Sequence, residues 1–303
     1  MRIEISEKFN GKTILFFLKN ELCLSSKMIT SLKGLEKGIM VNGCRVTVRH
    51  VLENGEVLEL LTDDTKENEN IVPTEMPLDI IYEDDDILVV SKPPMMPTHP
   101  SHGHFYDTLA NAVCFHMQKT RSEPFVFRSV NRLDRNTSGL VLIAKNRISA
   151  SRLYSAMQKG EIKKRYIALL DGVIEPSSGV IDTYIRRQKE SIIFREVCEA
   201  LPDASRAVTY YKTIGCNDKI SVVCAEPVTG RTHQLRVHFA HMGASIIGDE
   251  LYGKPSKDIG RHALHAYSLS FSHPKTKEQI ELKAPLPEDI KKVLSANELE
   301  IEV

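Results

Sequence analysis

The chain has 303 residues, of which 42% are apolar and 26% are charged, and this balance excludes a chain that is disordered overall. Its formal net charge at pH 7 is zero, so affinity for a polyanion would have to come from a local excess of Lys and Arg. The first residues lack the basic start and apolar stretch of a secretory signal, and no apolar run is long enough to span a membrane. We therefore expect a cytoplasmic protein with no membrane partner.

The first 72 residues predict a small α/β module. Helical patterns cover residues 12–20 and 26–33, and two short strand segments, 40–48 and 51–60, each turn on an Asn-Gly pair. This arrangement resembles a small RNA-binding module of bacterial ribosomal proteins. Acidic residues roughly cancel the basic ones that RNA would use, so a structural adaptor stays an alternative. The basic candidates are Lys27, Lys33, Lys37, Arg45 and Arg49.

An acidic stretch follows the module and predicts a domain boundary. Residues 62–86 carry ten Asp and Glu side chains, and Pro73 and Pro77 lie among them. Charge and proline both oppose the burial that a core requires. The prediction is a module of residues 1–72 followed by a larger domain of residues 73–303.

The larger domain is predicted to be rich in strands. Helices are expected at 107–118, capped by Asp107, at 148–158, ended by Gly160, and at 232–242, capped by Thr232. Because strands outnumber helices and follow one another at irregular intervals, we predict an α+β fold with a mixed, mainly antiparallel sheet and flanking helices. The expected strands are 78–83, 87–92, 125–130, 140–145, 165–170, 207–214 and 219–226.

One segment of this domain is strongly basic. Between residues 117 and 170 there are twelve Lys and Arg but only Glu123, Asp134 and Glu161 as acids, a local excess of nine positive charges. Such an excess favours contact with a polyanion.

Asp134 lies inside the basic segment, between Arg132 and Arg135, and a turn and an apolar strand follow it. Neighbouring guanidinium groups favour an ionised carboxylate, and anchoring on a strand keeps it aimed, as a nucleophile requires. An ordinary turn with a surface ion pair is the alternative explanation of the same spacing. A second functional candidate is Arg236, because the predicted 232–242 helix places Leu235, Phe239 and Met242 on one apolar stripe and leaves Arg236 off it.

Residues 132–140, with the sequence Arg-Leu-Asp-Arg-Asn-Thr-Ser-Gly-Leu, resemble the signature loop of the RluA-type family of RNA pseudouridine synthases. One departure precedes the loop, since Asn131 stands where many members have His, and we expect it to alter packing and not activity. Further motifs agree in order, and the resemblance covers residues 78–285. They are Lys92-Pro93-Pro94, His99-Pro100, Lys164-Arg165-Tyr166, residues 230–238, Gly248-Asp249, Tyr252-Gly253, Leu264-His265-Ala266 and His273-Pro274.

The resemblance implies a bent central sheet and a catalytic group of three residues. Asp134 would be the nucleophile that opens the glycosidic bond of a uridine, either by attack on the ribose or the uracil or by promoting elimination. Tyr166 would pack on the base and assist proton transfer from carbon 5, although a buried aromatic with no role in catalysis is an alternative. Arg236 would pair with the Asp134 carboxylate and hold it ionised.

The resemblance also implies RNA contacts and no cofactor or metal. Arg132 would compensate for the uridine that must leave the RNA stack. We expect ribosomal RNA as substrate, with transfer RNA as the alternative, and a monomeric enzyme. The remaining expected RNA-binding residues are Arg135, Thr137, Lys164, Arg231, His233, Gln234 and Leu235.

Two other functional classes fit parts of the sequence. A metal-dependent hydrolase could be built on the many histidines, but His102 and His104 lie in a Pro- and Gly-rich loop without companion carboxylates, and no His-Glu-x-x-His helix is present. A catalytically inactive RNA-binding protein of the same fold is the second alternative. Six scattered cysteines form no Cys-x-x-Cys pair and are expected to be small buried side chains without chemistry.

Overall fold

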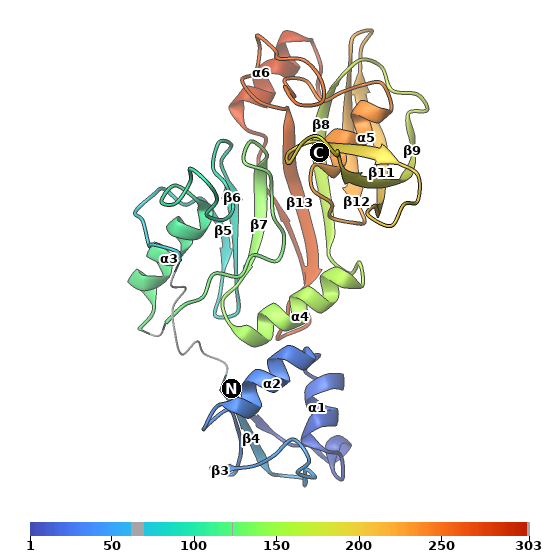
Figure 1. Cartoon of the computed structure of the whole chain (residues 1–303). Helices are drawn as coiled ribbons and strands as arrows, with labels where there is room; N and C mark the ends of the chain where they lie inside the picture. Colours follow the sequence, from blue (N-terminus) through green and yellow to red (C-terminus); the bar gives the residue numbers. More distant parts are fainter. Residues whose placement is uncertain (62–69, 123, 302–303) are drawn as a thin grey trace.

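A computed structural model describes residues 1–61, 70–122 and 124–301 of the chain. Its strands form two separate sheets, one of four strands at the N-terminus and one of ten strands in the rest of the chain (Figure 1). Four acids of the predicted acidic stretch, Asp63, Asp64, Glu67 and Glu69, lie outside the described residues, as does Glu123.

The N-terminal sheet has the strand order β1-β4-β2-β3, and both predicted helices are present beside it. Asn42 and Gly43 form the predicted turn between β2 and β3, both with positive φ. The second Asn-Gly pair instead leads into β4, which pairs with the unpredicted strand β1. The elements are β1 (Arg2–Glu4), the 3-10 helix η1 (Glu7–Phe9), α1 (Ile14–Asn20), α2 (Ser26–Gly34), β2 (Ile39–Val41), β3 (Cys44–Arg45) and β4 (Val57–Leu60).

The ten-stranded sheet confirms the predicted mixed, mainly antiparallel topology. Its order is β10-β9-β11-β12-β8-β13-β7-β6-β5, with β14 paired to β13. All named pairs are antiparallel except β7 with β13. The strands are β5 (Ile80–Glu83), β6 (Ile87–Lys92), β7 (Ser138–Ala144), β8 (Lys163–Asp171), β9 (Ser178–Arg187), β10 (Arg195–Cys198), β11 (Ser205–Cys216), β12 (Ile220–Pro227), β13 (Leu264–Ser272) and β14 (Gln279–Lys283).

Four helices accompany this sheet: α3 (Leu109–Thr120), α4 (Arg147–Gln158), α5 (Gln234–His241) and α6 (Glu288–Ala296). The predicted cap of α3 was wrong, because Thr108 and Asn111 form a capping box and Asp107 lies outside it. The predicted cap of α5 was also wrong. Its N-cap is His233 in the left-handed conformation, which leaves Thr232 outside the helix.

Helix α4 lies between the two sheets (Figure 1). Its residue Ile148 is buried in the apolar core of the N-terminal module. The Arg147 guanidinium donates to the Ser31 hydroxyl at 2.6 Å, and the Ser151 hydroxyl donates to the Cys23 carbonyl. The C-terminal end of the same helix reaches the pocket described below, so α4 links the module to that pocket.

Several predictions of local structure were wrong. Residues 125–130 form no strand, although Val130 and Arg128 exchange backbone hydrogen bonds with β7. Strands β9, β10, β13 and β14 and helix α6 were not predicted. Of the six cysteines only Cys114 is buried, so the expectation of six buried side chains fails. No described helix has the length and apolar character needed to cross a membrane.

Candidate active site

One pocket, with a volume of about 1060 Å³, brings together all eleven residues that the sequence singled out as catalytic or RNA-binding. Five separate segments line it, together with His104 and Leu264: residues 97–101, the 129–137 segment that leads into β7, the C-terminal half of α4, the start of β8, and residues 227–236. These segments are far apart in the sequence. The order of the strands brings them together, because β8 pairs with β13 and β13 pairs with β7.

Asp134 lies in the loop immediately before β7, and backbone contacts hold that loop on both sides. The Thr98 hydroxyl donates to the Leu133 carbonyl at 3.0 Å and accepts from its amide. The Thr137 amide donates to the Asp134 carbonyl. Lys92, almost completely buried, donates to the Arg135 carbonyl at 3.1 Å. The Asp134 carboxylate is therefore carried on a fixed loop and is still partly open to the pocket, with its side chain 29% exposed.

Arg236 connects Asp134 to a second, buried carboxylate. Its Nε and Nη2 donate to the two oxygens of Asp249, both at 2.7 Å, while Nη1 lies 3.5 Å from Oδ2 of Asp134. Burial by itself raises the pKa of Asp249, but the hydrogen bonds and charge of Arg236 lower it overall. This planar fork fixes the guanidinium and directs its remaining nitrogen at Asp134.

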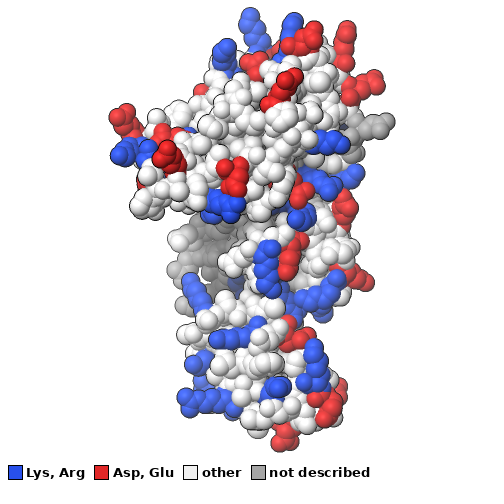
Figure 2. Space-filling model, turned by 90° about the vertical axis from the view of Figure 1, so that its right-hand side faces the viewer, with Lys and Arg blue, Asp and Glu red and all other residues white. Residues whose placement is uncertain are grey.

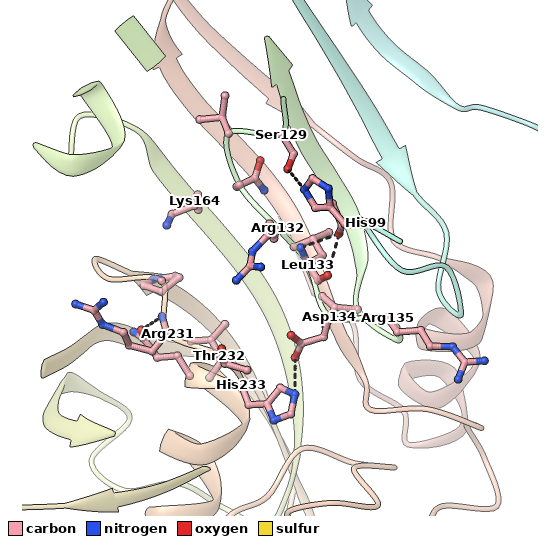
Figure 3. Close-up of a pocket in the computed structure, with 18 of the residues that line it drawn as sticks. His99, Ser129, Arg132, Leu133, Asp134, Arg135, Lys164, Arg231, Thr232 and His233 are labelled. Atoms are coloured by element: carbon pink, nitrogen blue, oxygen red, sulfur yellow. Dashed lines mark hydrogen bonds and ion pairs between the residues drawn. The ribbon is translucent and has the colours of Figure 1, made fainter. Parts of the chain in front are cut away.

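His233 also approaches Asp134, as Figure 3 shows, with Nε2 at 4.0 Å from Oδ2. Its Nδ1 lies 2.8 Å from the Tyr252 hydroxyl, and that hydroxyl also accepts from the Arg195 amide. Burial lowers the pKa of His233, and the Asp134 charge only partly opposes this. The imidazole is therefore neutral at pH 7, and Arg236 is the cation that faces Asp134.

Tyr166 extends from β8 to the pocket wall and is 8% exposed. Burial, and after it the negative charge of Asp134, raises the pKa of its phenol. The hydroxyl thus stays protonated at neutral pH. Such a ring offers an apolar face to a base and a proton to donate, but it is a weak general base.

Two cations face the pocket interior. Arg132 and Lys164 point into the same space in Figure 3, and within the described residues neither side chain has a hydrogen-bond or ion-pair partner. Burial lowers the pKa of Lys164. Arg135 points away from the Asp134 carboxylate in Figure 3, and its Nε donates to the Met95 carbonyl. Arg231 is exposed at the pocket rim, where its Nε donates to the Arg206 carbonyl.

Three further predicted RNA contacts are buried in the wall. The Gln234 amide accepts from the Thr229 hydroxyl and the Arg231 amide, and it donates to Val208 and Thr209. All its hydrogen-bonding positions are used, which makes it a brace for the arginine loop. Thr137 contacts the His262 ring at 2.8 Å, and Leu235 belongs to the main apolar core.

The basic excess of residues 117–170 is partly neutralised in three dimensions. Lys145 pairs with Glu83 at 2.8 Å, and Lys119 with Glu75 at 3.2 Å, so the acidic stretch supplies partners for the basic one. On the face shown in Figure 2, Lys and Arg alternate with Asp and Glu from the module to the larger domain. Part of the basic excess is therefore used in ion pairs within the protein.

Asp249, Tyr252 and Lys92 belong to the site although the sequence motifs that contain them predicted no role for them. The available signal for Asp249 was an acidic pair, Asp249-Glu250, placed between the apolar residues Ile246-Ile247 and Leu251. Asn131 takes a structural position, because its amide donates to the Leu140 carbonyl and accepts from the Leu142 amide.

The histidines considered for a metal site have separate partners. His99 contacts Ser129 at 3.0 Å, His104 contacts Asp107, and His116 contacts Glu83. In the described part of the chain, no three or more His, Cys, Asp or Glu side chains come together in a group that could hold a metal ion.

Comparison with known proteins identifies the family. Residues 86–241 match the family described as RNA pseudouridylate synthase. The uncharacterized RNA pseudouridine synthase YjbO of Bacillus subtilis is 39% identical over 90% of this chain and 95% of its own length. The ribosomal large subunit pseudouridine synthase D of Neisseria meningitidis serogroup A is 34% identical over 88% of this chain and 73% of its own.

Solved structures agree on the fold. Human RNA pseudouridylate synthase domain containing 4 superposes with a TM-score of 0.63 at 23% identity, covering 74% of this chain and 95% of its own. Human RNA pseudouridylate synthase domain containing 1 superposes with a TM-score of 0.57 at 26% identity, covering 75% of this chain and 97% of its own. The resemblance predicted from the motifs is confirmed: the chain belongs to the RNA pseudouridylate synthase family, and it is an RNA pseudouridine synthase, an isomerase.

Proposed function

We propose that the enzyme converts uridines of structured ribosomal large-subunit RNA to pseudouridine, with Asp134 as the nucleophile. The observation that carries the proposal is the Asp134 carboxylate, which faces the pocket and lies 3.5 Å from a guanidinium held by a buried partner. The Asp134 carboxylate is not held in a tight ion pair and stays open to the substrate, since Asp249 takes both short bonds of Arg236.

The reaction breaks the bond between ribose carbon 1 and uracil nitrogen 1 and forms a bond from the same carbon to carbon 5. Asp134 starts it, by attack or by promoting elimination, and the base then turns within the pocket. Tyr166 packs on the uracil and supports transfer of the carbon 5 proton. Because burial raises the pKa of its phenol, the hydroxyl is protonated and does not itself accept that proton; the Asp134 carboxylate, free again once the new bond has formed, takes it, and nitrogen 1 gains a proton from water.

RNA binding is assigned to the cations of the pocket and rim. Arg132, Lys164 and Arg231 contact phosphates or take the space of the extruded uridine, and Arg135 adds charge outside the pocket. The preference for ribosomal RNA rests on relatives named for the ribosomal large subunit. Residues 1–72 serve as an RNA-binding module attached to a catalytic domain of residues 73–303, and the enzyme acts as a cytoplasmic monomer.

The test is tritium release from RNA labelled at carbon 5 of uridine, taken separately as total ribosomal and total transfer RNA from cells that lack the enzyme. Wild-type protein is expected to release tritium from ribosomal RNA, with and without chelator, whereas Asp134→Ala releases none above background. Release from transfer RNA alone would overturn the substrate, and release by Asp134→Ala would overturn the nucleophile.

A further inference from the structure

Tyr154 is an aromatic residue of the pocket that the reaction does not use. It lies on α4 and lines the same pocket as Asp134, yet its residue surface is 41% exposed. Its neighbour Leu153 is buried in the apolar core beneath the helix. An exposed aromatic ring in the wall of an RNA-binding pocket has the chemistry of a stacking surface for an unpaired base.

The Tyr154 ring is held in place before any RNA binds. Its hydroxyl donates to the Ser129 carbonyl at 3.1 Å, and the Ser129 hydroxyl lies 3.0 Å from Nε2 of His99. The ring is thus tied to the 129–137 segment as well as to α4. A side chain already fixed in one orientation loses little conformational entropy when a base stacks on it.

Positive charge without a protein partner lines the same pocket. Lys164 is only 8% exposed, and among the described residues its ammonium has neither a hydrogen bond nor an ion pair. Burial of an unpaired ammonium is costly, so the group is compensated when an anion enters. Arg132 also lines this pocket and is also without a partner within the described part of the chain.

The distance to the reacting centre suits a nucleotide close to the target. Ser129, which holds the Tyr154 hydroxyl, precedes Asp134 by five residues. An extended chain of this length spans at most roughly 18 Å. The Ser129 backbone that holds Tyr154 is therefore within reach of the nucleotides beside the target, and the ring assigned to the target base itself is that of Tyr166.

We propose that Tyr154, Lys164 and Arg132 form a subsite for a nucleotide that flanks the target uridine, with its base stacked on Tyr154 and its phosphate held by the two cations. The inference rests on the proposed function, because it takes Asp134 as the place where the target base reacts. It adds a residue outside the catalytic group that binds RNA through a base and not through charge.

The experiment uses full-length enzyme and large-subunit ribosomal RNA transcribed in vitro and labelled at carbon 5 of uridine. Single-turnover tritium release at increasing enzyme concentration separates the Kd of the RNA from the maximal rate. Tyr154→Ala is expected to weaken binding about tenfold, the effect of losing one stacked base, and to leave the maximal rate within about twofold. Tyr154→Phe keeps the ring and is expected to bind within about twofold of wild type.

Tyr210→Ala is the matched control, since Tyr210 is 51% exposed on β11 and does not line the pocket. It should leave the Kd unchanged. Lys164→Ala should reduce the slope of log affinity against log salt by about 0.7, whereas Tyr154→Ala leaves that slope unaltered. Thermal unfolding of each variant shows whether it is folded at the assay temperature.

The subsite is contradicted if Tyr154→Ala binds like wild type, if Tyr210→Ala weakens binding equally, or if Tyr154→Ala lowers the maximal rate alone. These outcomes are distinct from failure of the proposed function, in which Asp134→Ala retains turnover. Once the target position is mapped, an RNA with an abasic nucleotide on either side provides a second measurement. If wild type binds both abasic RNAs more tightly than Tyr154→Ala does, by the same factor as it binds the intact RNA, the proposal is also overturned.

Discussion

Arg236 is shared between two carboxylates, and the sharing is unequal. Asp249 takes two bonds of 2.7 Å, while Asp134 stands at 3.5 Å from the third nitrogen. Asp249 is completely buried at its side chain, so removing it would leave a buried guanidinium with no close partner. We regard Asp249 as a positioning residue, because it acts on the reaction only through Arg236.

Asp249→Ala is expected to lower kcat about a hundredfold, with a smaller change in KM for RNA, because Arg236 loses its orientation toward Asp134. It is also expected to destabilise the fold by about 3–5 kcal/mol, the cost of leaving a buried charge unpaired. The double variant Asp249→Leu with Arg236→Met removes both charges. This double variant should recover much of the stability lost in Asp249→Ala but no turnover, which would show that the loss of kcat is not caused by unfolding. Recovery of turnover in the double variant would contradict the role of Arg236.

For single residues, the complete motifs predicted correctly which side chains line the pocket. They did not predict which of those side chains are bonded to distant parts of the chain. The eleven predicted residues do gather in one pocket. Which of them are free to meet RNA could not be predicted, because that depends on bonds such as those of Gln234 to Val208 and Thr209. The role of Tyr154 was hidden for the same reason, since a helix residue becomes a pocket residue only through its neighbours.

Among the elements, the parallel pair of β7 and β13 decides the position of the catalytic loop. Gly139 has φ +111°, and a Cβ at this position would lie 2.2 Å from the Ala266 carbonyl oxygen. No side chain fits between two backbones at that distance. The glycine of the signature loop is therefore required by the approach of β13 to β7, directly after the Asp134 turn.

Gly139→Ala is expected to destabilise the protein by at least about 2 kcal/mol, since both the backbone conformation and the space exclude a methyl group. Urea unfolding monitored by circular dichroism measures this. Gly260→Ala is the control, because Gly260 has no atom within 4 Å of an added Cβ and no positive φ. Equal stability of Gly139→Ala and wild type would show that the two strands are not held this closely.

Two of the strands that the sequence failed to predict, β9 and β14, depend on pairing with their neighbours. Strand β14 alternates exposed and half-buried residues and β9 ends in two arginines, so neither has the apolar content that marks a strand on its own. The converse error was 125–130, where Phe125, Phe127 and Val130 are buried without a strand. Apolar content predicted burial there but not backbone pairing.

For the molecule as a whole, three buried histidines link stability to pH. Burial is the main cause that lowers the pKa of His238, His262 and His265 to about 4 in each case, from an ordinary value of 6.5. Between pH 4 and pH 6.5 these histidines bind more protons in the unfolded chain than in the folded protein. Stability is therefore full above pH 6.5 and falls as the pH drops toward 4.

Each of these histidines is expected to contribute a loss of about 1.4 kcal/mol per pH unit within that window. The free energy of unfolding, measured in urea at pH 7.5 and pH 5, should fall less in His238→Gln than in wild type. His102→Gln is the control, because His102 lies exposed in a loop. The burial of neutral imidazoles would be contradicted if the free energy of unfolding of wild type were the same at pH 7.5 and pH 5, or if it fell equally in wild type and His238→Gln.

The charge of the whole chain illustrates why net charge alone misleads. The total is zero, but ion pairs such as Lys145 with Glu83 use part of the basic excess inside the protein, while Lys164 and Arg132 in the pocket stay without partners among the described residues. The binding energy for RNA is thus expected to come from a few cations and an aromatic surface close to Asp134 and not from a broad basic face.

The most direct test of the account is single-turnover tritium release from carbon-5-labelled ribosomal RNA by Asp134→Asn, with RNA binding measured on the same preparation. The variant keeps the size of the side chain and removes its charge, so binding by the pocket cations should stay within about threefold of wild type. We predict that tritium release falls to background while binding persists. Release at a rate comparable to wild type would contradict the assignment of Asp134 as the nucleophile, and with it the central claim.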